Sequence, residues 1–208
     1  MSMFFTFPDN NGATNSYLHR NLLPLVESIE VNETESYTLE CLGMGDVSST
    51  SGFVVKMGIK LEEFWNKVII DNAHSMITIS NMITVNNKKR QMDMFFEKNE
   101  TLYYLECKSN VNFDSEKTKA SDEKVRAISE QVKLSHPTHT LVSGYFMPNC
   151  KKIEKKYLTK YTNRGINIFG VNWLHNTVQC KDFTVEEYFT FLRDVCGPIA
   201  QQKLNIKV

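Results

Sequence analysis

The sequence lacks several features that identify common protein classes. Its 208 residues carry 24 Lys and Arg against 24 Asp and Glu, so the net charge is zero. The overall charge therefore gives no evidence for a nucleic-acid partner. No apolar run approaches the roughly 18 residues that a membrane-spanning helix needs. The five cysteines form no CxxC pair, and no signal peptide is recognisable. These absences predict a cytoplasmic protein with reduced thiols and no membrane association.

Motifs for several enzyme classes are missing as well. The glycine-containing stretch 43–52 (GMGDVSSTSG) lacks the Gly-Lys-Ser/Thr ending of a phosphate-binding loop, so we expect a flexible loop there. The five histidines form no HExxH or HxxxH pattern, and no GxSxG is present. Zinc-dependent and serine-dependent hydrolysis are therefore disfavoured.

What is present is a succession of helical and strand patterns. Apolar periodicity predicts helices over residues 13–30 (interrupted at Pro24), 60–73, 121–134 (capped by Ser121), 151–164 and 183–195 (capped by Thr184). Apolar runs predict strands over residues 75–85, 92–96, 101–107, 140–147 and 166–174.

This order predicts the α/β class, with a mixed central sheet in which a three-strand meander is followed by crossovers and helices cover both faces. We expect a single domain over residues 1–208, in which a helical and loop region, 1–57, packs on a core formed by 58–195.

Charged residues fall at unusual places in the two central strands. Asp93 lies within the first run, MDMFF, and Glu106 and Lys108 lie at the end of the second, TLYYLEC, and just after it. Because residues i and i+2 of a strand share a face, Glu106 and Lys108 should project together, and strand pairing can bring Asp93 to them. Bringing two carboxylates and an ammonium group together at the edge of a sheet costs free energy, so their convergence favours a functional site.

The chemistry that suits this trio is hydrolysis assisted by a metal ion. Mg²⁺ prefers oxygen ligands and needs only one or two carboxylates. Asp93 and Glu106 can supply these, and the backbone carbonyl of Cys107 can complete the protein ligands. Lys108 would then assist the attacking water or balance the charge of a phosphate.

An Asp that precedes Glu-x-Lys by 13 residues, with the Glu-x-Lys at the end of the next strand, resembles the PD-(D/E)XK nuclease superfamily. The segment RQMDMFF…YYLECKSNVNFDSEK is further similar to type II restriction endonucleases, although Met92 stands where the family motif has proline. The resemblance covers residues 58–119. It implies a restriction-endonuclease-like fold and the catalytic set Asp93, Glu106 and Lys108.

The resemblance also implies an auxiliary acidic residue on the preceding helix. Glu62 is our choice, for a second metal or a water, because Phe64 and Trp65 follow it, but Glu63 is equally well placed by sequence alone. Gln91 precedes Asp93 by two residues, so it should share the same face and contact a phosphate or the water.

Local clusters of positive charge are the candidates for DNA contacts. One precedes Asp93, one lies in the loop 109–119, and one lies in the basic segment 151–164, where a solvated helix face is the alternative explanation. The residues we select are Lys88, Lys89, Arg90, Lys117, Lys119, Lys152 and Lys156.

Together these features predict a Mg²⁺-dependent endonuclease, with Mn²⁺ as a substitute, that cuts double-stranded DNA at a short specific sequence and leaves 5′-phosphate and 3′-hydroxyl ends. We expect a homodimer, because two copies related by a two-fold axis can cut both strands of a symmetric site. The alternatives are a structure-specific repair, recombination or phage-type nuclease and an inactive DNA-binding module of the same fold.

Overall fold

The computed structural model describes residues 16–30, 33–34, 47–48, 50–72, 76–78, 81–108 and 115–204. Its strands are β1 Glu33–Thr34, β2 Val47–Ser48, β3 Met76–Thr78, β4 Met82–Val85, β5 Lys88–Gln91, β6 Met94–Lys98, β7 Thr101–Cys107, β8 Thr140–Met147 and β9 Asn167–Gly170. Its helices are α1 Ser16–Asn21, α2 Leu23–Glu27, α4 Thr50–Asp71, α5 Ser115–Ser135, α6 Lys155–Thr162, α7 Val171–Val178, α8 Val185–Phe191, the π-helical turn η2 Leu192–Cys196 and α9 Gly197–Lys203.

The centre of the fold is a five-stranded mixed sheet in the order β3-β6-β7-β8-β9. The pairs β3–β6 and β6–β7 are antiparallel, whereas β7–β8 and β8–β9 are parallel. Helix α5 connects β7 to β8, and α6 precedes β9, as expected for parallel neighbours joined by helical crossovers. The α/β class with a mixed sheet between helices is confirmed.

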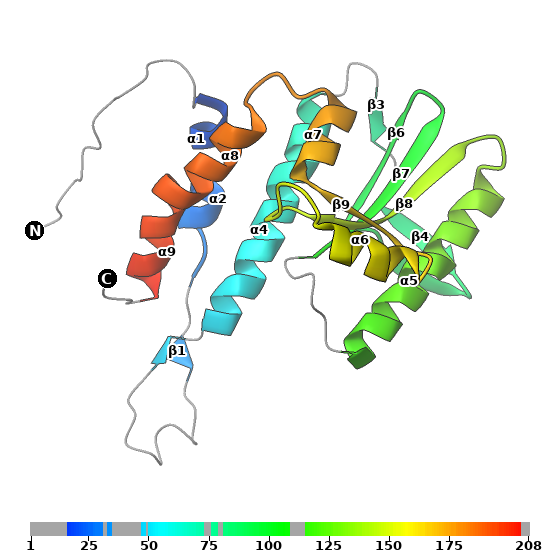
Figure 1. Cartoon of the computed structure of the whole chain (residues 1–208), viewed down its shortest axis with the longest axis horizontal. Coiled ribbons are helices and arrows are strands. Elements are labelled where there is room, and N and C mark those ends of the chain that lie inside the picture. The colour runs from blue at the N-terminus through cyan, green and yellow to red at the C-terminus, as the bar shows by residue number, and fades with distance from the viewer. Residues whose placement is uncertain are drawn as a thin grey trace, which may run out of the picture.

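Two apolar cores lie on the opposite faces of this sheet. One core joins the sheet to α4, α7, α8 and the N-terminal helices, around Phe64, Trp65, Phe146 and Tyr188. The other joins it to α5, α6 and β4, around Tyr104 and Ile128. Figure 1 shows α4 between the sheet and the helices of both chain ends, and α5 on the other side of the sheet. Among the described residues, no helix is long and apolar enough to cross a membrane.

The helices expected over 13–30 and 183–195 are present, and Pro24 and Thr184 act in them as predicted. Pro24 occupies the first turn of α2, which separates this helix from α1 as predicted. Thr184 accepts a hydrogen bond from the backbone of Glu187, whose side chain bonds back to Thr184, so that a capping box begins α8. The chain then continues helically to Lys203, well beyond the predicted end.

Other predicted boundaries were wrong. Helix α4 begins at Thr50 and not at residue 60, so the loop expected over 43–52 gives way to helix at its end; residues 43–46 and 49 lie outside the described part. Buried Phe53 and Leu61, with Met57 between them, extend the apolar stripe of α4 at four-residue steps and outweigh the low helix propensity of Gly52. Helix α5 begins at Ser115, so Ser121 does not cap it.

Two expected strands are also divided differently. The run 75–85 forms β3 and β4, which belong to different sheets, and the basic segment after it forms strand β5, which pairs with β4. Asn86 and Asn87 make the two-residue connection with φ of 50° and 60°, values that asparagine tolerates. The run 166–174 is strand only to Gly170, after which Val171, Leu174 and Val178 form the buried side of α7.

The predicted helix over 151–164 is shorter, as α6 Lys155–Thr162. The division of residues 1–208 into a 1–57 region and a 58–195 core stays a prediction.

Candidate active site

Asp93 lies where the chain returns from the β4–β5 hairpin to the central sheet. It occupies a bend one residue before β6, so the expectation that it lies inside a strand was wrong. Its Oδ2 accepts a hydrogen bond of 2.8 Å from the backbone N–H of Cys107, and its carbonyl accepts one of 2.9 Å from Asn66 Nδ2. These bonds hold Asp93 between the end of β7 and α4.

Glu106 is buried near the end of β7, with 2% of its surface exposed. Its Oε1 accepts a hydrogen bond of 2.8 Å from the hydroxyl of Tyr104, and Lys124 Nζ lies 2.7 Å from Oε1 and 2.8 Å from Oε2. Lys108 Nζ lies 3.8 Å from Oε2. The structure thus brings Glu106 and Lys108 together and adds a second lysine from α5.

Glu62 lies at the margin of the buried face of α4 and joins this group. Burial, followed by the charges of Asp93 and Glu106, raises the pKa of Glu62 from 4.5 to about 7. Glu63 points elsewhere, because it is more exposed and pairs with Lys60 at 2.9 Å. Of the two residues left open by sequence, the structure places Glu62 beside Asp93 and Glu106.

The carboxylates face one another with too little positive charge to balance them. Burial and the nearby Glu106 raise the pKa of Asp93 above its usual value, even though the N–H of Cys107 stabilises the charged form. When all three carboxylates are ionised, the two lysines, Lys108 and Lys124, leave an excess of one negative charge. Such an arrangement is typical of functional sites and favours a bound cation.

Cys107 contributes to the site through its backbone and its side chain. Its Sγ lies within 4.8 Å of one carboxylate oxygen of Glu62 and one of Asp93. Burial, and then the charges of Glu62 and Asp93, raise the pKa of the thiol well above its usual value, so the thiol stays protonated. The other candidate donors of the site are carboxylate oxygens, which prefer hard cations.

The backbone of Cys107 faces Asp93. In the parallel pair β7–β8, Lys108 donates its N–H to the carbonyl of Phe146, the residue opposite Cys107. In a parallel pair, the backbone groups of the residues that flank Cys107 bond to β8. The N–H and carbonyl of Cys107 itself therefore point away from β8, to the side of β7 on which β6 lies. The bond from this N–H to Asp93 agrees with that direction.

Lys124 was missed at the level of sequence. It lies four residues before Ile128, on the border of the apolar stripe of α5 that packs on the sheet. A lysine at the margin of a stripe that covers a buried Glu could have been noted, because a helix crossing back over the sheet passes above the strand that precedes it.

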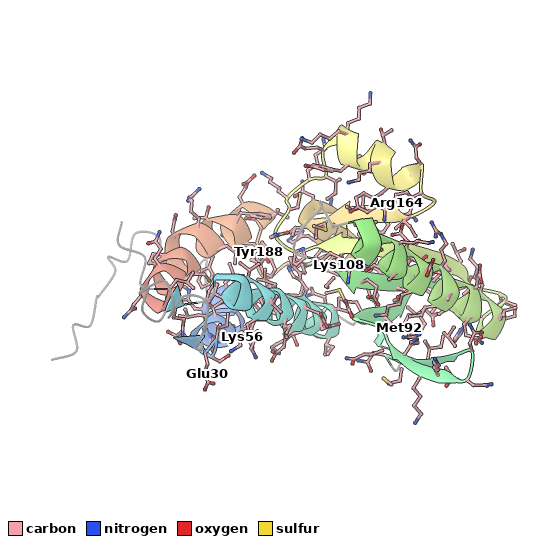
Figure 2. The ribbon with its side chains drawn as sticks, turned by 90° about the horizontal axis from the view of Figure 1, so that it is seen from below. Glu30, Lys56, Met92, Lys108, Arg164 and Tyr188 are labelled. Atoms are coloured by element: carbon pink, nitrogen blue, oxygen red, sulfur yellow. The ribbon has the colours of Figure 1, made fainter. Side chains whose placement is uncertain are left out.

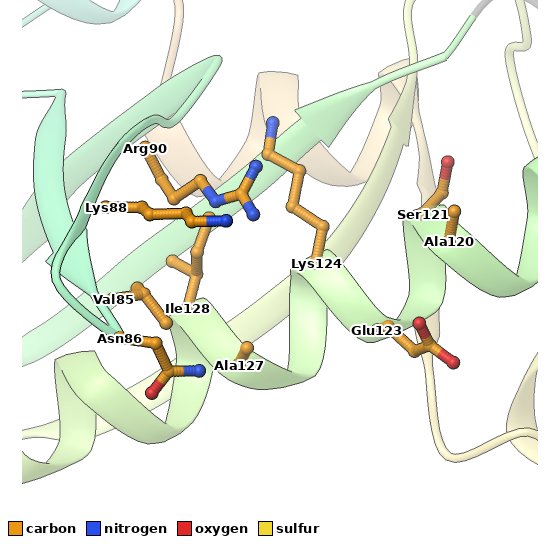
Figure 3. A pocket seen from close by; sticks show the side chains of 10 residues that line it. All are labelled: Val85, Asn86, Lys88, Arg90, Ala120, Ser121, Glu123, Lys124, Ala127 and Ile128. Atoms are coloured by element: carbon orange, nitrogen blue, oxygen red, sulfur yellow. The ribbon is translucent and has the colours of Figure 1, made fainter.

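Of the basic residues before Asp93, two line a cleft beside the candidate active site and one does not. Lys88 and Arg90 line a cleft of about 560 Å³ between the β4–β5 hairpin and α5, whereas Lys89 does not line it. Figure 3 shows Lys88 and Arg90 extending toward Lys124. Gln91 ends β5, and because the strand ends before Asp93, the alternation that predicted a shared face does not reach that residue.

The other predicted DNA contacts lie on two helical segments. Lys119 is exposed on α5; Lys117 belongs to the same helix, but its side chain and residues 109–114 lie outside the described part. Lys152 is exposed before α6, and Lys156 pairs with Glu154 at 2.9 Å and lies over the ring of Tyr157. In the same segment Arg164 turns inward to the buried Asp122 (Arg164 and Lys108 are labelled in Figure 2).

Comparisons with known proteins complete the description of the site. No protein-family model and no curated protein matches the sequence. The fold is similar to that of Can2 from Sulfobacillus thermosulfidooxidans, solved in complex with cyclic tetra-adenylate, at 13% identity and a TM-score of 0.44 over 79% of this chain and 52% of Can2.

It is also similar to protein VC1899 from Vibrio cholerae, at 13% identity and a TM-score of 0.41 over 82% of this chain and 58% of that protein. The chain thus spans little more than half of the length of either structure. At this level of similarity neither structure assigns a role to any residue, so the function must be argued from the site.

Proposed function

We propose that the protein is a metal-dependent nuclease that hydrolyses phosphodiester bonds of double-stranded DNA. One observation carries the proposal: Glu62, Asp93 and Glu106 come together from α4, the bend before β6 and the end of β7, with Lys108 beside them. The resemblance of the Asp…Glu-x-Lys pattern to PD-(D/E)XK nucleases supports the same proposal.

The donor atoms fit a hard divalent cation. The raised pKa values of Glu62 and Asp93 reflect carboxylates that a cation would stabilise in their charged form. Mg²⁺ prefers oxygen ligands and Mn²⁺ accepts the same set. We assign Asp93, Glu106 and the carbonyl of Cys107 as the metal ligands.

The bound metal supplies the activation of water and the stabilisation of charge on the phosphate. The other residues act directly on the reactants. Lys108, 3.8 Å from Glu106, offers its ammonium group to a phosphate oxygen or to the attacking water. Glu62, beside Asp93 and Glu106, can accept a proton from the attacking water. Lys124 and Tyr104 hold the carboxylate of Glu106 in place.

The finer parts of the proposal concern specificity and assembly. We propose cleavage at a short specific sequence, as in type II restriction endonucleases, with 5′-phosphate and 3′-hydroxyl products. A homodimer follows from this proposal, because a symmetric site is most simply cut by two copies of one active site. Mapping the ends of fragments from a sequenced plasmid tests the specificity, and the oligomeric state in solution tests the dimer.

The decisive experiment is plasmid cleavage with Mg²⁺ by matched variants. We expect Asp93→Asn and Glu106→Gln to abolish cleavage, whereas Glu63→Gln, which changes an exposed glutamate on the same helix as Glu62, should cut like the parent. The proposal is wrong if Glu106→Gln cuts as fast as the parent, or if the purified parent cuts neither duplex nor single-stranded DNA with Mg²⁺ or Mn²⁺.

A further inference from the structure

The β4–β5 hairpin has two faces of different character. Val85 lies opposite Lys88, and Ile83 lies opposite Arg90, so these four side chains share one face of the hairpin. Val85 is buried and Ile83 is partly buried against the core formed with α5. The long side chains of Lys88 and Arg90 therefore extend from an anchored face that is turned toward α5, whereas Lys89 belongs to the other face.

The face turned toward α5 borders the cleft described above. The cleft is lined on the hairpin side by Asn86, Lys88 and Arg90, and on the helix side by residues that include Ser121 and Lys124. In Figure 3 the amino group of Lys88 and the guanidinium group of Arg90 point into the space in front of Lys124. Three cations and a single acidic residue, Glu123, line this space.

The two hairpin cations are not engaged elsewhere in the described part of the chain. Neither Lys88 nor Arg90 forms an ion pair or a side-chain hydrogen bond with another described residue. By contrast, two basic residues near α6 are paired, Lys156 with Glu154 and Lys151 with Glu186. Unpaired cations that converge on a hollow are placed to bind an anion of corresponding charge.

Lys124 connects this cleft to the candidate active site. It is the residue that both lines the cleft and forms an ion pair with Glu106. A ligand in the cleft therefore lies within the length of one side chain of the proposed metal ligands. An anion seated there would be adjacent to the phosphate that is cleaved.

We propose that the cleft between the β4–β5 hairpin and α5 binds the phosphodiester backbone of one nucleic-acid strand, next to the scissile phosphate, through Lys88 and Arg90. A volume of about 560 Å³ is in the range of small-ligand sites and holds a short piece of one strand, not the width of a duplex. This inference rests on the proposed nuclease function and adds to it the path of the substrate strand.

Three variants of the hairpin, each lacking one positive charge, test the inference. The readout is the anisotropy of a fluorescein-labelled DNA, measured without metal so that no cleavage occurs, over a series of salt concentrations. A phosphate contact adds about 0.9 to the slope of log affinity against log salt for duplex DNA and about 0.7 for a single strand. Lys88, Lys89 and Arg90 are exposed, so their variants should fold like the parent.

We expect Lys88→Ala and Arg90→Ala each to weaken binding by roughly fivefold at low salt and to lower the slope by about one contact, on single-stranded and duplex DNA alike. Lys89→Ala removes the same charge from the opposite face of the same strand, outside the cleft, and should change both quantities less than either of the other variants. The inference is overturned if Lys89→Ala weakens binding as much as the other two, or if Lys88→Ala and Arg90→Ala bind like the parent.

The same proteins separate this inference from the proposed function. If the parent cleaves DNA with Mg²⁺ but the Lys88 and Arg90 variants bind normally, the cleft is wrong and the nuclease proposal stands. If the Lys88 and Arg90 variants lose binding but no metal supports cleavage by the parent, the strand-binding cleft stands and the nuclease proposal fails.

Discussion

Two buried carboxylates on the α5 side of the sheet are alike in their immediate contacts and different in their wider surroundings. Glu106 is 2% exposed and Asp122 is 4% exposed. Each accepts a hydrogen bond from a tyrosine hydroxyl of a central strand, Glu106 from Tyr104 at 2.8 Å and Asp122 from Tyr145 at 2.7 Å. Each also forms an ion pair with a basic side chain.

The difference lies in the cation and in what surrounds the pair. Asp122 is held by Arg164, whose guanidinium nitrogens reach both carboxylate oxygens and whose charge lies over the ring of Tyr161. This pair is complete, because a planar guanidinium satisfies a carboxylate with fixed geometry. Glu106 is instead paired with two lysines and borders two more carboxylates with raised pKa values.

Burial and ion pairing alone therefore do not identify a catalytic carboxylate. The excess of negative charge around Glu106, and the open cleft on the far side of Lys124, distinguish the candidate active site from the structural pair. Substitution of Glu106 should accordingly affect mainly activity, and substitution of Asp122 should affect mainly stability.

The largest expected effect is the loss of activity on changing Glu106. Glu106→Gln removes a proposed metal ligand, and we expect the cleavage rate to fall roughly 1,000-fold. The free energy of unfolding should change by less than about 1 kcal/mol, since Lys108 and Lys124 retain access to solvent and the repulsion among the carboxylates is relieved. Plasmid cleavage and urea denaturation of the same preparation measure both quantities.

Asp122→Asn should show the reverse. Removing one partner of a buried ion pair leaves the charge of Arg164 uncompensated, which we expect to lower the free energy of unfolding by about 3 kcal/mol. The folded fraction should still cleave DNA within a few-fold of the parent rate. Loss of cleavage in a variant that remains folded, at a temperature well below its Tm, would show that the two sites are not independent.

How much of this contrast the sequence could predict depends on the range of the contacts. Asp93, Glu106 and Lys108 could be selected because strand alternation and hairpin pairing are local rules, and Glu62 because it lies on a well-marked amphipathic helix. Lys124 and Arg164 were not selected, because their partners lie 18 and 42 residues away, and for Lys124 the only available signal was its place at the margin of the apolar stripe of α5.

The errors in the predicted fold have a similar origin. Short apolar runs are ambiguous between strand and helix, which explains the missed α7 after Gly170. Strand β5 was not predicted, because lysine has a low β propensity. Its conformation depends instead on its pairing with β4 and on the packing of Val85 against α5.

The two tyrosines allow a finer comparison, with smaller effects. Tyr145→Phe removes a hydrogen bond to the structural Asp122, and we expect it to lower the free energy of unfolding by about 2 kcal/mol with cleavage unchanged. Tyr104→Phe frees one acceptor position of Glu106, and we expect the affinity for Mg²⁺ to fall about tenfold, measured as the Mg²⁺ concentration that gives half-maximal cleavage. Equal Mg²⁺ dependence in the two variants would contradict the assignment of Glu106 as a ligand.

The smallest expected effect is the pH dependence of stability of the metal-free protein. The pKa of Glu62 is raised from 4.5 to about 7 in the folded state, so between these values the folded protein keeps a proton that the unfolded chain releases. Glu62 therefore lowers the free energy of unfolding as the pH rises from about 4.5 to 7. Because Glu62 is partly exposed, solvent screening should reduce this contribution to about 1 kcal/mol.

Comparison with Glu62→Gln isolates this contribution. The side chain of Gln does not ionise, so the variant does not lose stability as the pH rises through the pKa of Glu62. The difference in free energy of unfolding between Glu62→Gln and the parent should therefore grow from pH 5 to pH 8. Glu63→Gln, the matched change on the exposed side of α4, should follow the parent at every pH. Saturating Mg²⁺ should reduce the difference at pH 8, because a cation beside Asp93 stabilises the charged form of Glu62. If Glu62→Gln and the parent differ by a constant amount from pH 5 to pH 8, Glu62 does not share the electrostatic environment of Asp93 and Glu106, and its assigned place in the active site is wrong.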